Sequence, residues 1–162
     1  MTSLAPASRV EHDVSFLFDH NGHVLRTRMS AALAEIGLTP RMHCVLVHAQ
    51  EEERTQNQLA EIGDMDKTTM VATADALERG GLAERRPSSK DRRARVIAVT
   101  EKGAEVAARS QEIVDSVHAE VLAALPEDER EVFVRAMNRL ATGLLAEPVA
   151  STSARRTRER AL

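Results

Sequence analysis

The densest cluster of charged side chains lies in a short stretch near the middle of the chain. Eleven residues from Arg85 to Arg95 hold six basic side chains and one acidic one, namely Arg85, Arg86, Lys90, Arg92, Arg93 and Arg95 against Asp91. Basic groups at this density suit phosphate contact or insertion into the narrow, electronegative minor groove of DNA. A solvated edge strand also carries basic residues, which there only prevent aggregation. The neighbouring elements must decide between these two interpretations.

Histidines and a single cysteine form a second group of chemically capable residues. His20 and His23 are three positions apart and share one helical face, where they could hydrogen-bond a carboxylate or share a metal, although ordinary polar or interface roles are more common. No spacing in the chain resembles a zinc motif, so no metal and no cofactor is expected. Cys44 adjoins His43 and precedes His48 by four positions, which permits an oxidant-sensing thiolate. The apolar neighbours of Cys44 favour a small buried residue instead.

Composition limits the fold and the class of function. The chain has 162 residues, 43% of them hydrophobic, with three Phe and no Trp or Tyr, which favours helix packing over a β-sandwich. This length fits one domain, or one domain plus a lobe that is stable only when paired with a second copy. Apolar stretches are too short to span a bilayer and no leader pattern is present, so a cytoplasmic protein is expected. No Gly-rich phosphate loop, nucleophile elbow or His-Glu-x-x-His motif occurs, and an enzyme is not expected.

Hydrophobic periodicity predicts a mainly α protein with one β-hairpin. A long amphipathic helix is expected from about Val10 to Ile36 and a second from Pro40 to Glu52. A short helix follows from a capping box at Thr55 and Gln58 through Ile62, and Asp66 caps a fourth that ends at Gly80-Gly81. Two further helices are expected over Glu101 to Ala124 and Glu127 to Leu145.

The basic stretch falls in the one segment where the helical period is lost. Leu82 to Arg86 is extended, Pro87 to Asp91 is rich in turn residues, and Arg93 to Val99 alternates before it becomes apolar. A hairpin directly after two short helices with a tight connection is typical of a winged helix-turn-helix, in which the second helix enters the major groove. This context favours a DNA-binding wing over a solvated edge strand.

Several runs of residues together resemble the MarR family of bacterial regulators. They are Leu59-Ala60-Glu61, Asp66-Lys67-Thr68-Thr69, Leu77 to Leu82, Asp91-Arg92-Arg93 and Val99 to Gly103. The resemblance extends over roughly Val14 to Leu145, because the long flanking helices also match the family plan. It implies a homodimer with a helical dimerisation lobe, 10–36 and 101–146, and a winged helix-turn-helix lobe, 39–100. Residues 1–9 are expected to be a flexible N-terminus and 147–162 a disordered basic tail.

The same resemblance assigns the DNA contacts. Asp91 would brace an arginine that enters the minor groove, and Asp66 through Arg79 would form the recognition helix, with an exposed face of Lys67, Thr68, Val71, Ala72 and Asp75. Family members often carry polar or basic residues where this chain has Val71 and Ala72, so the sequence choice would depend on thymine methyls, DNA shape and the wing. Each threonine at the helix start has the alternative role of satisfying its own backbone. The full predicted set is Thr55, Gln56, Lys67, Thr68, Thr69, Val71, Ala72, Arg86, Ser88, Lys90, Asp91, Arg92, Arg93 and Arg95.

An effector site is also implied, since members of the family respond to ligands between the two lobes. The residues predicted for it are His20, His23, Arg26, Arg28, His43 and Cys44. Arginine and protonated histidine pair well with carboxylates, so a small anionic or phenolic effector is expected. The sequence thus predicts a homodimeric repressor that binds duplex DNA. Binding of the effector would release the protein from the DNA. Two alternatives stay open: a helical interaction module that has lost DNA binding, and an oxidant sensor acting through Cys44.

Overall fold

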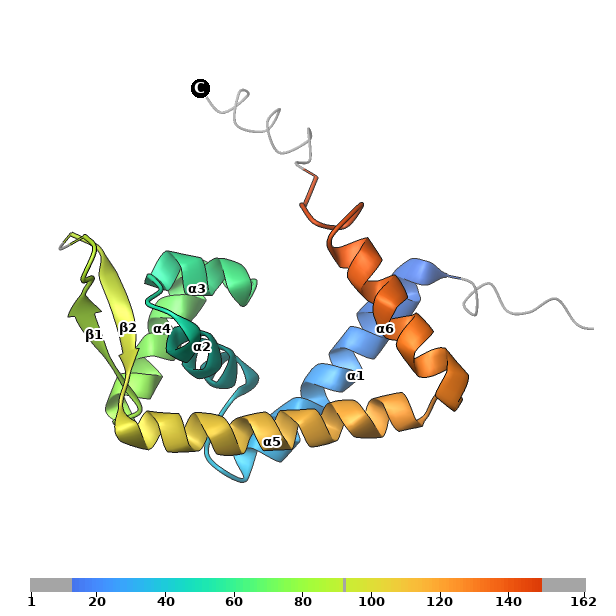
Figure 1. Ribbon diagram of the computed structural model, residues 1–162, viewed down its shortest axis with the longest axis horizontal. Helices are drawn as coiled ribbons and strands as arrows, with labels where there is room; N and C mark the ends of the chain where they lie inside the picture. Colours follow the sequence, from blue (N-terminus) through green and yellow to red (C-terminus); the bar gives the residue numbers. More distant parts are fainter. Residues whose placement is uncertain (1–12, 92, 150–162) are drawn as a thin grey trace, which may run out of the picture. The chain divides into compact units, whose positions relative to one another are not determined.

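The computed structural model of the chain describes residues 13–91 and 93–149. It divides into two compact units, Met1–His118 and Ala119–Leu162. The described elements are six helices and one two-stranded antiparallel sheet, which confirms the expected mainly α fold with a hairpin (Figure 1). No helix among the described residues is long and apolar enough to cross a membrane.

The first unit begins with two helices whose start sites carry side-chain caps. Helix α1 spans Val14–Ala34, and its N-cap Asp13 accepts a hydrogen bond from the Phe16 N–H. The sequence predicts a helix start at about Val10, whereas Asp13 is the N-cap and the helix begins at Val14. Residues 10–12 lie outside the described residues. Helix α2 spans Pro40–Glu51, with Thr39 as N-cap and Pro40 in the first turn, as the sequence predicts.

The helix-turn-helix is built from α3, Gln56–Ile62, and α4, Lys67–Arg79. The capping box at Thr55 and Gln58 and the Asp66 N-cap are both present, which confirms these two helix starts. Both helices pack on α2 and on each other. Their buried side chains, Leu59, Met70 and Leu77, join Val45 and Leu46 in the core.

The hairpin consists of β1, Ala83–Pro87, and β2, Arg95–Val99, paired antiparallel with Ala83 opposite Val99 and Pro87 opposite Arg95. Pro87, expected in the turn, is the last residue of β1, while Arg93 and Ala94, expected in the strand, belong to the turn. Proline is tolerated there because an end position of a two-stranded sheet needs no N–H from it. We call β1, the turn and β2 together the wing.

Helix α5, Glu101–Ala123, begins shortly after β2, and its first turn contacts the end of α4. Thr100 donates its backbone N–H to Leu82 O and its hydroxyl to Gly81 O, and Lys102 Nζ donates to Gly80 O. Gly81 has φ +67°, a backbone conformation that glycine adopts without strain. The C-terminus of α4 and the N-terminus of α5 are therefore joined by several hydrogen bonds.

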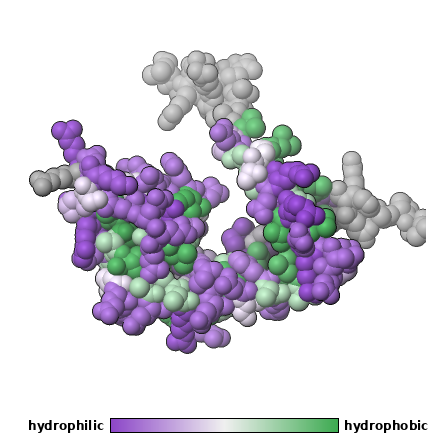
Figure 2. All heavy atoms as spheres, in the orientation of Figure 1, coloured by the Kyte–Doolittle hydropathy of each residue, from purple (hydrophilic) through white to green (hydrophobic). Residues whose placement is uncertain are grey.

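The second unit holds α6, Glu127–Ala141, which ends four residues before the predicted Leu145. Thr142 caps it, with its N–H bonded to Asn138 O. None of its residues is buried, and hydrophobic side chains gather on the surface of this part of the chain (Figure 2). Residues 39–100 contain α2, α3, α4 and the wing, and α1 belongs to the same compact unit as these elements. The proposed division into dimerisation and DNA-binding lobes stays a prediction.

Candidate nucleic-acid interface

The five residues of α4 that the sequence predicts to face outward line one shallow hollow on the surface of the helix. Lys67, Thr68, Val71 and Ala72 are exposed and Asp75 is partly exposed. We call these five residues the recognition face. Opposite them, Met70, Thr73, Ala74 and Leu77 are buried against the core, which fixes the rotation of the helix.

The first turn of α4 uses some of its polar groups to cap itself. Asp66 accepts hydrogen bonds from the Thr69 N–H at 2.8 Å and the Thr69 hydroxyl at 2.7 Å. These bonds favour the ionised carboxylate and hold the pKa of Asp66 below its ordinary value. Of the two threonines predicted to contact DNA, Thr69 is thus engaged within the helix start, whereas Thr68 is exposed.

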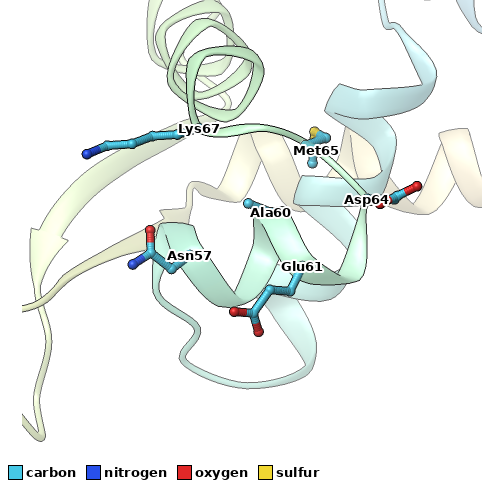
Figure 3. Close-up of a pocket in the computed structure, with 6 residues that line it drawn as sticks. All are labelled: Asn57, Ala60, Glu61, Asp64, Met65 and Lys67. Atoms are coloured by element: carbon cyan, nitrogen blue, oxygen red, sulfur yellow. The ribbon is translucent and has the colours of Figure 1, made fainter. Parts of the chain in front are cut away.

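Lys67 begins the recognition face and points away from the nearby acids. Figure 3 shows its side chain extending away from Glu61 and Asp64, although all three residues line one hollow at the turn between α3 and α4. No ion pair to Lys67 occurs among the described residues. Its ammonium group is therefore available for a phosphate.

The two predicted residues at the start of α3, Thr55 and Gln56, are half-buried. Thr55 donates its hydroxyl to Gln58 Oε1 at 3.0 Å and accepts from the Gln58 N–H at 3.3 Å. Gln56 has a buried amide nitrogen that lacks a hydrogen-bond partner among the described residues. Both side chains are better placed to position α3 than to reach a ligand.

The basic residues of the wing fall into two groups. Arg85 is engaged by α4: its Nη2 lies 2.6 Å from Asp75 Oδ1 and 3.3 Å from Val71 O, and its other branch pairs with Glu78. Arg86 pairs with Glu84 on the same strand. Lys90, Arg93 and Arg95 are exposed at the turn and at the start of β2, and Arg92 lies outside the described residues. The positive charge that faces solvent is concentrated at the tip of the wing.

Ser88, predicted as a DNA contact, is instead buried at the base of that tip. Its hydroxyl donates to Glu53 and accepts from the backbone N–H groups of Lys90 at 3.0 Å and Asp91 at 3.2 Å. The Ser88 hydroxyl and then Ser89 hold the pKa of Glu53 below its ordinary value. Ser88 therefore shapes the turn that carries the basic residues.

The carboxylate of Asp91 stabilises the same turn by a bond to backbone, and its predicted role as a brace for a minor-groove arginine stays a prediction. Its Oδ1 accepts from the Arg93 N–H at 2.9 Å. The link between α2 and α3 also supports strand β2 of the wing. The Ile97 N–H donates to Arg54 O at 3.4 Å, and Thr55 forms an isolated antiparallel β-bridge with Val96. Glu53 was not singled out from the sequence, and Arg85 was noted there only as one of the basic residues of the hairpin, without a role in fastening it to α4.

The residues predicted for an effector site lie on two helices, four of them on α1 and two on α2. His20 stacks on Phe16 with ring centroids 5.4 Å apart, and His23, Arg26 and Arg28 are exposed on α1. His43 is buried, and its Nδ1 lies 2.8 Å from the Ser110 hydroxyl on α5. Because Ser110 donates to Ala107 O, it accepts from His43, so the Nδ1 of His43 carries a proton. Desolvation, then His48 and His118, lower the pKa of His43, and Asp115 opposes them.

Cys44 faces a different neighbour from His43. Its sulfur lies beside Gly63 at the end of α3, within 3.3 Å of where a Cβ would stand on that glycine. Burial raises the pKa of the Cys44 thiol, which disfavours the reactive thiolate. Cys44 is half-buried, and these observations favour a small packed residue over a reactive thiolate. Among the described residues no group of three or more His, Cys, Asp or Glu side chains could hold a metal ion.

Comparison with known proteins agrees with this geometry. The profile of the MarR family matches residues 36–94, which cover the helix-turn-helix and most of the wing. A MarR-family transcriptional regulator from Rhodococcus sp. RHA1 is 26% identical, with a TM-score of 0.75 over 83% of this chain and 96% of that one. Residues 36–94 thus match the MarR family, and the chain is similar in fold to a MarR-family regulator over most of its length.

Two further structures show members of the family with bound molecules. CouR from Rhodococcus jostii RHA1, bound to p-coumaroyl-CoA, is 27% identical, with a TM-score of 0.75 over 90% of this chain and 99% of that one. The transcriptional repressor CouR bound to a 23-mer DNA duplex is 25% identical, with a TM-score of 0.74 over 86% of this chain and 99% of that one. The chain therefore has the fold of MarR-family transcription regulators.

Proposed function

We propose that this protein is a homodimeric transcriptional repressor that binds a pseudopalindromic DNA operator. The recognition face of α4 would enter the major groove and the tip of the wing would enter the minor groove. The observation that carries the proposal is the exposed recognition face beside a wing whose Lys90, Arg93 and Arg95 are solvent-exposed. The DNA-bound repressor with the same fold supports it. Such a regulator works in the bacterial cytoplasm, where its operator is.

Duplex binding by the purified protein tests this proposal. Fragments of the promoter regions around its own gene are titrated over a range of salt concentrations, and a log-log slope of several units is expected because several phosphates are neutralised. Arg93→Ala should weaken binding by about 1 kcal/mol or more and reduce the slope by about one. A purified, folded protein that shifts no such fragment at low salt would favour the alternative of an interaction module without DNA binding.

We also propose that a small anionic or phenolic effector releases the DNA. The relative that is bound to p-coumaroyl-CoA supports a ligand-responsive regulator. His43 is the strongest candidate to sense the effector, because it is buried between α2 and α5 and α5 contacts the end of the recognition helix. Titration of the protein–DNA complex with small carboxylates and phenolic acids should release DNA with one of them, and His43→Ala should blunt that release while duplex affinity is retained. An undiminished response of His43→Ala would place the effector elsewhere.

A further inference from the structure

The centre of the recognition face is apolar although it is exposed. Val71 is 41% exposed and Ala72 is exposed beside it, and both line the shallow hollow. The same helix buries Met70 to 2% and Leu77 to 0% exposure, so the helix is well packed on its inner side. The exposure of Val71 therefore does not come from a loose core. We call Val71 and Ala72 the apolar pair.

The polar groups around the apolar pair are few, and one is already engaged. The only carboxylate of the recognition face, Asp75, is held by Arg85 at 2.6 Å, and the same guanidinium contacts Val71 O. Lys67 stands at the N-terminal end of the face, where an ammonium group reaches backbone phosphates. None of the five residues is the Arg, Asn or Gln that makes bidentate bonds to guanine or adenine.

A base feature that an apolar side chain recognises in the major groove is the C5-methyl group of thymine. From this match we infer that the apolar pair selects the half-site by packing against thymine methyl groups. The inference rests on the proposed DNA binding and deepens it, because it names the chemical group that is recognised. Recognition through DNA shape alone, with the wing as the sole reader, is the competing mechanism.

The test compares duplexes that differ only in that methyl group. The full-length protein first selects its preferred duplex from a random pool, and each thymine of that duplex is then replaced in turn by uracil. Uracil keeps the pairing edge and the O4 acceptor and lacks only the methyl. We expect about fourfold weaker binding at one or two positions in each half-site, the value of one buried methyl group. 5-Bromouracil, whose halogen is close to a methyl group in size, should restore the affinity at those positions.

Two variants connect the effect to the apolar pair. Val71→Ala removes two methyl groups while alanine favours the helix, and it should abolish the difference between thymine and uracil at one position of each half-site. Lys67→Ala serves as the matched control on the same face, because the loss of a phosphate contact should weaken the thymine and uracil duplexes by the same factor. Thermal unfolding of both variants checks that they are folded.

The outcomes separate this inference from the function on which it rests. If no duplex is enriched or bound in a salt-dependent manner, the proposed function fails. If a duplex is bound tightly but every uracil replacement changes the dissociation constant by less than twofold, DNA binding stands and methyl recognition is overturned. Retention of the full thymine preference in Val71→Ala would overturn the assignment to the apolar pair.

Discussion

Arginines that are close in the sequence have different roles because their nearest acids differ. Arg85 is bound by Asp75 and Glu78 of α4, so it fastens the wing to the recognition helix. Arg93 is exposed, and its bond to Asp91 uses the backbone N–H and not the guanidinium. The count of basic residues in a sequence therefore overstates the charge that a wing can present to DNA.

Ser88 is expected to control the wing without contacting DNA. Ser88→Ala removes one hydroxyl that serves three hydrogen bonds, to Glu53, Lys90 N–H and Asp91 N–H. It should lower the free energy of unfolding by about 1 to 3 kcal/mol, since buried donors lose their acceptor, and weaken duplex binding. Chemical denaturation and duplex titration measure the two effects. Ser89→Ala is the comparison variant: it removes a neighbouring hydroxyl that also interacts with Glu53, but it keeps the Ser89 backbone N–H bonds to Glu53 and all three bonds of the Ser88 hydroxyl. Equal behaviour of the two variants would remove Ser88 from this role.

His43 should make the stability of the protein depend on pH near neutrality. Desolvation, with His48 and His118, holds the folded-state pKa of His43 below 6.5, while Asp115 acts in the opposite direction. The unfolded chain then binds a proton that the folded protein does not bind, so stability is full above about pH 6.5 and decreases as the pH falls from there toward the folded pKa. Thermal unfolding between pH 5 and 8 should show this loss.

The variant His43→Gln assigns that loss to one residue. Glutamine keeps an N–H donor for the Ser110 hydroxyl but does not titrate, so the slope of melting temperature against pH should become flatter below pH 6.5. His48→Gln provides the comparison from the same helix. An unchanged slope in His43→Gln would mean that other groups cause the pH dependence.

At the level of elements, the junction between α4 and α5 depends on a glycine inside a helix. A Cβ on Gly103 would stand 1.9 Å from Leu82 O and 2.8 Å from Leu82 C, both backbone atoms that cannot move aside easily. Gly103→Ala should therefore lower the free energy of unfolding by 2 kcal/mol or more, about the cost of strain in a packed region. Helix propensity alone predicts the opposite sign, a gain of about 1 kcal/mol.

Gly22 in α1 is the matched control for that prediction. A Cβ there would meet only the end of the flexible Arg26 side chain, at 3.4 Å. Gly22→Ala should raise the free energy of unfolding by about 0.5 to 1 kcal/mol, as expected for an unobstructed helix position. Denaturation of the two variants by urea distinguishes them, and a stabilising Gly103→Ala would show that α4 and α5 do not meet as closely as described.

The sequence predicts elements better than it predicts partners of side chains. Caps such as Thr55 and Asp66 and the buried stripe of α4 follow from local rules, so the helix-turn-helix and its recognition face could be placed in advance. Ser88 could not be placed, because its burial depends on Glu53, which is 35 residues earlier in the chain. The pairing of His43 with Ser110 spans 67 residues and was equally out of reach.

At the level of the whole molecule, hydrophobic side chains remain exposed in both compact units. Val14 is 62% exposed and Phe18 37% on α1, and α6 exposes Val132, Phe133, Met137 and Leu140. On α6, residues 133, 137 and 140 recur at helical spacing and so share one face. A lone chain that left these faces in water would forgo much of the burial that stabilises a small domain. A second copy of the chain is the expected partner.

The protein is therefore predicted to be a dimer at micromolar concentration, with a melting temperature that rises with protein concentration. Met137→Glu places a charge in the centre of the apolar face of α6 and should shift the population toward monomer, because an unpaired carboxylate is costly to bury. Asn138→Glu introduces the same charge at the next position, about 100° around the helix, and should leave the dimer intact. Sedimentation velocity and melting at several concentrations measure both variants. A wild-type protein that sediments as a monomer and melts cooperatively at one temperature over a wide range of concentrations would contradict the dimer, and the exposed faces of α1 and α6 would then need another partner.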